Sequence, residues 1–328
     1  MRIAFWGTSS FVGSVRNAEI LEELVRAGIR PAVAITTSPR ESGSPESPVK
    51  TAADALGIPT LEPASLKDFA GELTRRDIEL SIVASYGKIL PRDVLSVPRF
   101  GSLNIHPSLL PRWRGPTPIQ ATILEGDAET GVTIIAMDEK MDHGPVIASA
   151  EFPGRLLSAD NGLGKIQNAK ITAPELASKL AVMGARLLCN TLPDWIAGRI
   201  QPKTQDERMA TYSKMLRKED GRIEWQSLAA SIERMVRAYT PWPGTYTFWQ
   251  KSGKPLRLHI EAADVADDAT AALRPGVVAG RGGELLVGTS EGVLRIRRLK
   301  LEGGSSQDSP EFLRGHPGIN GATLNEHL

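Results

Sequence analysis

The pattern of apolar positions in the first part of the chain predicts strands that alternate with helices. We expect strands at residues 2–6, 31–36, 80–84, 100–106 and 131–136, and helices at residues 19–27 and 175–195. Continuous apolar strands between amphipathic helices are typical of an α/β fold with a doubly wound, mostly parallel sheet. The first part is therefore predicted to be Rossmann-like, and its last helix should close the domain.

The pattern changes near residue 198. Residues 198–220 are polar and lack periodic apolar positions, which predicts a linker into a second domain. A helix and several short strands divided by Gly and Pro should follow, at residues 228–239, 256–262, 276–278, 284–287 and 293–300. We therefore expect a first domain over residues 1–206 and a smaller β-barrel domain over residues 207–328.

Three polar side chains lie where these strands should end. Asn104 and His106 are two residues apart, so their side chains project from the same face of a strand. Pro107 cannot donate to a sheet and places His106 at the strand end, where open α/β sheets bind ligands. The loop after the next strand brings Asp142. An amide donor, an imidazole and a carboxylate together suit acyl transfer to an amine without a covalent intermediate.

Each of these residues has a plainer interpretation when it is taken alone. A single histidine at a strand end is more often structural, and an aspartate in a polar loop is a common turn residue. The combination of the three favours catalysis. Leu109 and Leu110 would alone be core, but the apolar residues 109–111 beside this site suggest a flat organic cofactor. Arg112 and Arg114 around Trp113 fit equally well a solvated loop or a stacking surface for an anionic ligand.

The composition indicates a soluble globular protein. The 328 residues are 41% hydrophobic and 23% charged, which fits two domains. The net charge is +1, and residues 207–328 hold 17 Lys and Arg against 15 Asp and Glu, so no strongly basic domain indicates RNA. The single cysteine, Cys189, excludes an intramolecular disulfide. No apolar run reaches the roughly 18 residues of a membrane span, so we expect a cytoplasmic protein with no membrane contact.

Two classes of cofactor are not expected. Ser9 and Val12 occupy positions after Gly7 where a dinucleotide fingerprint needs glycine, which argues against a nicotinamide cofactor. The five histidines lie far apart in the sequence, and one cysteine cannot complete a zinc site, so no metal is predicted.

The polar motif resembles that of the folate-dependent formyltransferases. Their shared pattern is an Asn-x-His strand end, a Ser-Leu-Leu-Pro turn and a later Asp-x-x-x-Asp-x-Gly loop, found here at residues 104–106, 108–111 and 138–144. Within that group the chain is most similar to the methionyl-tRNA formyltransferases, over nearly its whole length. Further matching segments lie at residues 7–11, 85–91, 218–225 and 237–244.

The resemblance implies formyl transfer from 10-formyltetrahydrofolate to the methionine amine of initiator methionyl-tRNA, by a monomer whose barrel is of the oligonucleotide-binding (OB) type. It assigns catalysis to Asn104, His106 and Asp142. It assigns the folate site to Ser108, Leu109, Leu110, Pro111, Tyr86 and Ile89. It makes tRNA contact credible at Arg40, Arg297, Arg298 and Lys300. Without it, the basic residues at 295–300 would be interpreted as a solvated edge strand whose charges prevent aggregation.

Some features depart from that family or leave an alternative open. Its members typically carry a basic insertion at residues 38–50, but here Glu41 and Glu46 offset Arg40 and Lys50, so this loop should contribute little affinity for tRNA. We assign no role to residues 160–172. The main alternative is an N-formyltransferase that acts on a nucleotide-linked amino sugar. A further alternative is an RNA-binding barrel attached to an inactive first domain.

Overall fold

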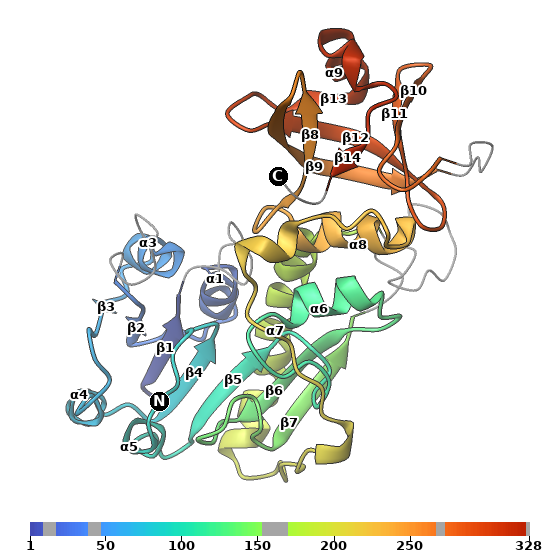
Figure 1. Ribbon diagram of the computed structural model, residues 1–328. Coiled ribbons are helices and arrows are strands. Elements are labelled where there is room, and N and C mark those ends of the chain that lie inside the picture. Colours follow the sequence, from blue (N-terminus) through green and yellow to red (C-terminus); the bar gives the residue numbers. More distant parts are fainter. Residues whose placement is uncertain (9–17, 39–46, 153–169, 267–272, 326–328) are drawn as a thin grey trace. The chain divides into compact units, whose positions relative to one another are not determined.

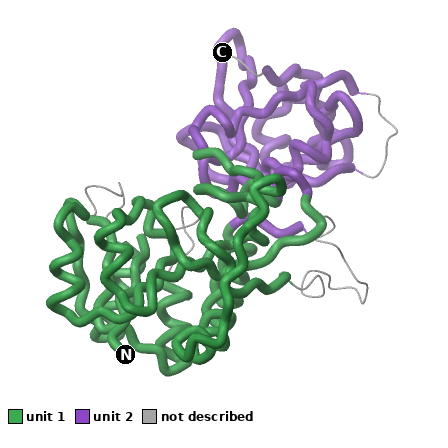
Figure 2. The backbone as a smooth tube through the Cα atoms, turned by 90° about the horizontal axis from the view of Figure 1, so that it is seen from below, with its two compact units in different colours: residues 1–122, 127–169, 174–215 green, residues 123–126, 170–173, 216–328 purple. Residues whose placement is uncertain are grey.

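The computed structural model describes residues 1–8, 18–38, 47–152, 170–266 and 273–325. Figure 2 shows two compact units, which are described separately below. The first comprises residues 1–122, 127–169 and 174–215, and the second comprises residues 123–126, 170–173 and 216–328. The predictions for Ser9, Val12, Arg40 and residues 160–169 lie outside the described residues.

A seven-stranded sheet forms the centre of the first unit (Figure 1). Its strands in spatial order are β3 (Thr60–Leu61), β2 (Val33–Ile35), β1 (Ile3–Gly7), β4 (Leu80–Ala84), β5 (Ser102–His106), β6 (Gly131–Ala136) and β7 (Val146–Glu151). The first five strands are parallel, whereas β6 is antiparallel to both of its neighbours. The predicted mostly parallel, Rossmann-like sheet is therefore confirmed.

Helices cover both faces of this sheet, as the continuous apolar strands require. The helices are α1 (Ala18–Arg26), α3 (Pro48–Ala55), α4 (Ala70–Arg75), α5 (Arg92–Leu95), α6 (Pro118–Glu125) and α7 (Ala173–Ile196). Trp6 of β1 packs in one core with Leu73 of α4 and Val94 of α5. On the opposite face, a Cβ on Gly7 would lie 3.1 Å from Val49 of α3. The sheet is thus doubly wound.

The segment after α7 is irregular and contains two short 3₁₀ turns, η3 (Glu207–Met209) and η4 (Lys218–Gly221). The first of these turns belongs to the first compact unit.

The second unit is an antiparallel sheet that curls until its ends meet. Its strands in spatial order are β10 (Val278–Arg281), β11 (Glu284–Gly288), β12 (Val293–Leu301), β9 (Lys254–Val265), β8 (Thr245–Lys251) and β14 (Leu324–Asn325), with β13 (Gln307–Asp308) paired to β12. An antiparallel bridge between Val277 and Thr323 joins the two ends of that order. Besides η4, the described part of this unit contains the helical segments α8 (Ala229–Tyr239), α9 (Ser309–Gly315) and η5 (Pro317–Ile319). The predicted small barrel is confirmed.

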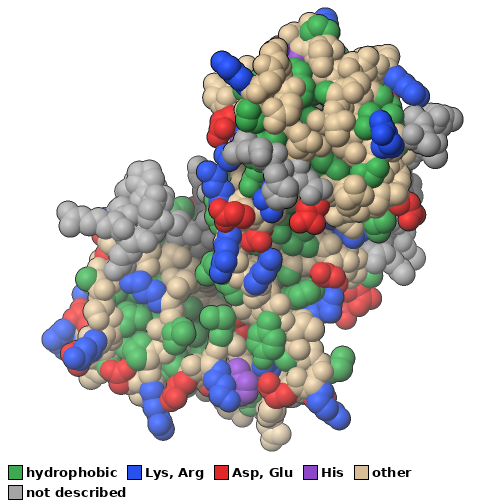
Figure 3. All heavy atoms as spheres, in the orientation of Figure 1, with side chains coloured by type: hydrophobic (Ala, Val, Ile, Leu, Met, Phe, Trp, Pro, Cys, Tyr) green, Lys and Arg blue, Asp and Glu red, His purple; other side chains and the backbone are tan. Residues whose placement is uncertain are grey.

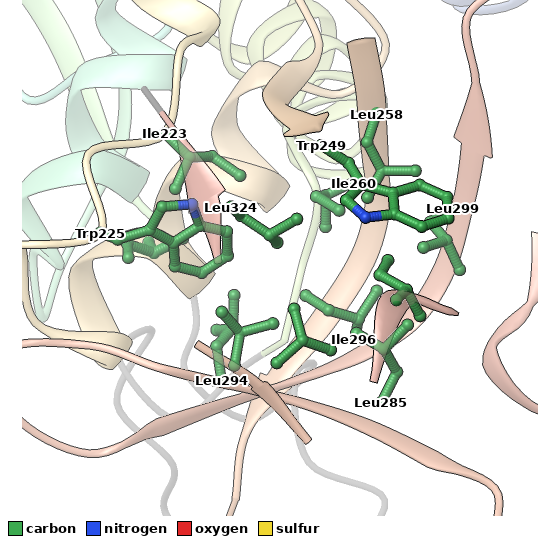
Figure 4. Close-up of a cluster of buried hydrophobic side chains, with 14 of the residues drawn as sticks. Ile223, Trp225, Trp249, Leu258, Ile260, Leu285, Leu294, Ile296, Leu299 and Leu324 are labelled. Carbon is green, nitrogen blue, oxygen red and sulfur yellow. The ribbon is translucent and has the colours of Figure 1, made fainter. Parts of the chain in front are cut away.

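The inward side chains of these strands form one apolar core (Figure 4). Trp249, Leu258 and Ile260 from β8 and β9 lie with Leu294 and Ile296 from β12, and all five are at most 2% exposed. Their alternation along the strands is the period-two pattern of a sheet with one buried face.

Candidate active site

Strand β5 places Asn104 and His106 on one face of the sheet, and the loop between β6 and β7 brings Asp142 to them. The Asn104 amide nitrogen donates to Asp142 Oδ1 over 3.3 Å, and His106 Nδ1 lies 3.5 Å from the same oxygen. Asp142 Oδ2 accepts from the backbone N–H of Gly115 over 2.8 Å. The His106 and Asp142 side chains are 5% and 14% exposed. The three predicted catalytic side chains therefore meet in one largely buried group.

The direction of β6 determines from which side the loop that follows it brings Asp142 to Asn104 and His106. Because β6 is antiparallel to β5, Ala136 at its end lies opposite Leu103 near the start of β5, and the following loop turns back over the sheet. Gly144 permits this turn, since a Cβ there would lie 1.9 Å from the Ala136 carbonyl oxygen. Asp142 itself has a φ of +49°, which few non-glycine residues adopt. The backbone path of a tight turn thus fixes the position of the carboxylate.

The second nitrogen of the His106 ring contacts the loop after β5. Nε2 lies 3.0 Å from the Trp113 carbonyl oxygen, and because a carbonyl only accepts, this nitrogen carries a hydrogen. The loop therefore supplies one contact to His106 and one to Asp142. They come from Trp113 and Gly115, one residue on either side of Arg114.

The turn at residues 108–111 is held in place by β6. The Ser108 hydroxyl is buried and donates to the Arg112 carbonyl over 2.6 Å. The Thr133 hydroxyl donates to the Ser108 carbonyl over 2.7 Å and accepts from the Leu110 N–H over 3.1 Å. Three residues of the turn are half-buried: Leu109, Leu110 and Pro111. Apolar surface at this turn thus remains partly open, whereas Ser108 is closed off from solvent.

The two arginines beside Trp113 differ from one another. Arg112 is 46% exposed, pairs with both carboxylate oxygens of Asp127, and stacks on the Trp113 ring 4.5 Å from its centroid. Arg114 is 1% exposed, and its guanidinium donates to both Glu207 oxygens over 2.7 and 3.1 Å. These hydrogen bonds hold the pKa of the Glu207 carboxyl below its ordinary value and raise the pKa of Arg114. Arg114 is therefore a buried structural cation.

Models of the formyl transferase family match both parts of the chain. The formyl transferase model matches residues 1–158, and the model of the formyl transferase C-terminal domain matches residues 215–317. A methionyl-tRNA formyltransferase from Chloroflexus aurantiacus (strain ATCC 29366 / DSM 635 / J-10-fl) is 44% identical over 291 residues, 86% of each chain. One from Roseiflexus sp. (strain RS-1) is 39% identical over 322 residues, 96% of this chain and 92% of the relative. The chain belongs to the methionyl-tRNA formyltransferase family.

Solved structures outside the methionyl-tRNA formyltransferase family share the fold. HypX from Aquifex aeolicus in complex with tetrahydrofolic acid superimposes with a TM-score of 0.62 at 18% identity, over 95% of this chain and 47% of that one. An N-formyltransferase from Helicobacter canadensis, in complex with folinic acid and dTDP-3-aminofucose, gives a TM-score of 0.62 at 15% identity, over 90% of this chain and 98% of that one. At these identities the likeness supports the fold alone.

Two hollows open in the first unit. One, of about 380 Å³, is lined by Arg92, Leu95, Ser96 and residues 137–140, which belong to the loop that carries Asp142. The other, of about 240 Å³, is lined by Ser108, Leu109, Arg112, Trp113, Thr122 and residues 127–130. Both therefore share a wall with a loop that contacts His106 or Asp142.

The two remaining predicted folate residues differ in exposure. Ile89 is 69% exposed and lies just before α5. Tyr86 is 2% exposed, and its ring packs edge-on against Trp6 with the ring centroids 5.1 Å apart. Ile89 is therefore open to a ligand, whereas the Tyr86 ring belongs to the core.

A β-bulge places four basic side chains on the outside of the barrel. Arg297 is an extra residue in β12, because Ile296 lies opposite Ala263 and Arg298 lies opposite Ala262. The bulge shifts the alternation of buried and outward-facing side chains along β12 by one position. Apolar residues 294, 296 and 299 therefore remain buried, while basic residues 295, 297, 298 and 300 are exposed or half-buried.

Acidic residues of the neighbouring strand β9 face these cations. Arg297 Nε donates to Asp264 Oδ2 over 2.6 Å, and Lys300 Nζ lies 3.2 Å from Glu261 Oε1. Arg298 Nε lies 3.9 Å from Glu261 Oε2. On the face drawn in Figure 3, basic and acidic side chains are likewise interspersed. The strand therefore presents ion pairs, not a field of positive charge.

Among the described residues, no group of three or more His, Cys, Asp or Glu side chains is arranged to hold a metal ion. None of the described helices is long and apolar enough to cross a membrane.

Residues 205–213 also contact the site, although the sequence predicts only a linker there. The Thr211 hydroxyl accepts from the Trp113 N–H over 2.9 Å, and the Arg114 carbonyl accepts from the Ser213 N–H over 2.7 Å. The side-chain oxygen of Gln205 accepts from Arg114 Nε over 3.0 Å. No spacing in this polar segment indicates these contacts, because each partner is about 90 residues or more away in the sequence.

Proposed function

We propose that the protein transfers the formyl group of 10-formyltetrahydrofolate to the methionine amine of initiator methionyl-tRNA. The observation that carries this proposal is the joining of Asn104, His106 and Asp142 on one sheet face, in a chain of the methionyl-tRNA formyltransferase family. We further propose that it acts as a monomer in the cytoplasm. Its relatives that bear this name match over most of their length, which supports the same acceptor.

The chemistry follows from what each side chain can donate or accept. The amine nitrogen attacks the formyl carbon, the C–N bond forms, and the carbonyl oxygen becomes an oxyanion. Asn104 has two amide hydrogens, of which the bond to Asp142 uses one. Asn104 would donate to the oxyanion, and so would a hydrogen on His106 Nδ1, because Nε2 already donates to the Trp113 carbonyl. Asp142 would assist removal of the amine proton. The bond from the formyl carbon to the folate nitrogen then breaks, and that nitrogen receives a proton.

The folate donor needs an apolar slot that opens onto this group. We propose that its flat ring occupies the hollow between Leu95 and residues 137–140, where Leu95 and Met137 supply apolar surface among polar neighbours. Ile89, which is exposed, is proposed as a further contact. This location is supported by the shared loop, since residues 137–140 lead directly into Asp142. The turn Ser108, Leu109, Leu110 and Pro111 remains a predicted part of the folate site, and its first two residues line the other hollow. Tyr86 would act by holding the loop that carries Ile89.

We propose that residues 1–206 carry catalysis and residues 207–328 carry the barrel, with the linker over 198–220. Contacts to tRNA phosphates are proposed for Arg40, Arg297, Arg298 and Lys300. Because the last three face carboxylates, tRNA must compete with internal ion pairs there, so we expect a modest contribution from each.

The direct test measures formyl transfer from 10-formyltetrahydrofolate to charged initiator tRNA. Elongator methionyl-tRNA and a nucleotide-linked amino sugar are offered in parallel, and the His106→Ala variant is the inactive control. Transfer to the initiator alone is the expected result. Transfer to the sugar alone would keep the catalytic group and overturn the acceptor, and transfer to none of the three would overturn the function.

A further inference from the structure

Gln205, which follows α7, is bonded to the loop that carries Asp142. Its side-chain nitrogen donates to the carbonyl oxygens of Asp142, over 2.9 Å, and of Gly144, over 2.7 Å. Gln205 is 6% exposed. One buried amide therefore holds the loop backbone at the residue whose carboxylate contacts His106.

Arg114 fixes the orientation of that amide. Arg114 Nε donates to Gln205 Oε1 over 3.0 Å, so the amide nitrogen must point the other way, toward the two loop carbonyls. The Arg114 guanidinium is itself held by both oxygens of Glu207 and by the Tyr212 hydroxyl at 3.3 Å. A chain of bonds thus runs from Glu207 through Arg114 and Gln205 to Asp142.

The backbone around Arg114 contacts the catalytic side chains from the opposite side. The Trp113 carbonyl accepts from His106, and the Gly115 N–H donates to Asp142. Residue 114 is pinned between them by a bond from its N–H to the Thr211 carbonyl over 2.9 Å. The same segment therefore holds both the histidine and the carboxylate.

Packing alone gives no reason for an arginine at this position. A guanidinium that is 1% exposed disfavours the folded state unless its donors are satisfied, and an apolar side chain of similar volume would fill the space at lower cost. What an apolar residue could not do is orient the Gln205 amide.

We infer that Gln205, oriented by Arg114 and Glu207, is a positioning residue for formyl transfer. It holds the Asp142 loop so that the carboxylate meets Asn104 and His106 in the reactive geometry. The inference rests on the proposed function and deepens it, because Gln205 acts through Asp142 and contacts no substrate.

Two variants test this in the full-length protein. Gln205→Leu removes the donor and the acceptor, whereas Gln205→Glu keeps the contact with Arg114 but places an acceptor against two carbonyl oxygens. Both should lower kcat about tenfold or more, with the KM for each substrate changed less than about threefold. The control, Arg199→Gln, removes an exposed ion pair with Asp194 and should keep the kcat of the wild type.

A double variant separates positioning from general destabilisation. If Gln205 acts through Asp142, then Gln205→Leu added to Asp142→Asn should lower kcat by less than about threefold beyond Asp142→Asn alone. Independent, multiplying losses would overturn the inference. If Gln205→Leu does not fold, Gln205→Glu combined with Asp142→Asn decides the same question.

The result also separates this inference from the proposed function. A wild-type protein that formylates no acceptor overturns the function. A wild-type protein that formylates initiator methionyl-tRNA, with Gln205 variants of unchanged kcat, overturns the positioning role alone.

Discussion

The proposed catalytic group on β5 and the basic strand β12 are the two regions for which the sequence predicts a function, and they differ in what surrounds their polar side chains. Asn104, His106 and Asp142 are largely buried, bonded to one another, and adjoin loops that line open hollows. The cations on β12 are more exposed, and carboxylates of β9 face them. The polar side chains on β5 contact one another in a single group, whereas the positive charges on β12 are largely neutralised by carboxylates of the barrel itself.

This difference shows what strand periodicity can and cannot predict. Alternation along each strand correctly predicts which side chains share a face. It does not predict which side chains the neighbouring element places opposite them. The loop after β6 supplies one carboxylate, Asp142, to the proposed catalytic group on β5, whereas β9 supplies two carboxylates that would compete with any polyanion for the cations of β12.

The largest effect should come from His106, the proposed donor to the oxyanion. His106→Ala should lower kcat by about a hundredfold or more, because a donor to the oxyanion is lost. The measurement is steady-state formylation of initiator methionyl-tRNA, with circular dichroism as the check that the variant folds. Undiminished turnover would remove the β5 group from the mechanism.

The tight turn that carries Asp142 should be the next most sensitive feature. Gly144→Ala would force a Cβ against the Ala136 carbonyl oxygen, so we expect a loss of about 1–3 kcal/mol in unfolding free energy and roughly tenfold in kcat. Gly71→Ala, in α4, is the matched control because its Cβ would meet nothing within 4 Å. That control should leave kcat unchanged and slightly raise stability. Equal effects of the two substitutions would contradict the assigned role of the turn.

Filling the proposed folate hollow should affect the donor and not the acceptor. Leu95→Trp occupies the space between α5 and residues 137–140, and should raise the KM for 10-formyltetrahydrofolate by roughly fivefold to tenfold. The KM for methionyl-tRNA provides the internal reference and should remain within about twofold. A normal KM for the folate would place the donor elsewhere.

The basic strand should respond weakly to loss of a cation and more clearly to loss of its partner. Arg297→Ala should weaken tRNA binding by less than about threefold. Asp264→Asn removes the carboxylate that holds Arg295 and Arg297, and should steepen the salt dependence of binding by about one unit of log K per log salt. Filter binding at several salt concentrations measures both. A tenfold loss for Arg297→Ala would instead make this strand a principal tRNA contact.

The smallest effect concerns pH and the exposed carboxyl of Glu207. The hydrogen bond from Arg114 lowers the pKa of Glu207 in the folded protein below the ordinary value of 4.5. The bond therefore stabilises the folded state fully above pH 4.5, and this stabilisation is lost as the pH falls through the lowered, folded-state pKa. The stability difference between the wild type and Glu207→Gln should therefore shrink as the pH drops below about 4.5. Denaturant titrations from pH 7 to pH 3 measure it. A difference that stays constant would show that the charge of Glu207 is immaterial.

The fold was largely predictable because its strands carry strong local signals. Strands 80–84 and 131–136 begin and end where the apolar runs do. The antiparallel direction of β6 was not predictable, since a strand buried on both faces shows the same apolar run in either direction. Helix α3 was also missed, although Pro48 at its start is a typical first helical residue.

The meeting of Asn104, His106 and Asp142 was predictable from the sequence, whereas the residues that hold them in place were not. Asn104 and His106 are close in sequence, and Asp142 follows a recognisable strand. Gln205 and Arg114, in contrast, meet across 91 positions, in a segment without periodic apolar residues. Only the folded backbone brings such distant polar residues together.

The bond from Gln205 to the Asp142 loop also has a consequence for the order in which the protein becomes active during its synthesis. A nascent chain that has emerged as far as residue 198 contains the whole seven-stranded sheet and all three side chains of the proposed catalytic group. It does not yet contain the glutamine that anchors the Asp142 loop, nor the threonine and serine that pin the backbone of residues 113 and 114. The site is therefore completed only once residue 213 has left the ribosome, just as the barrel begins to emerge.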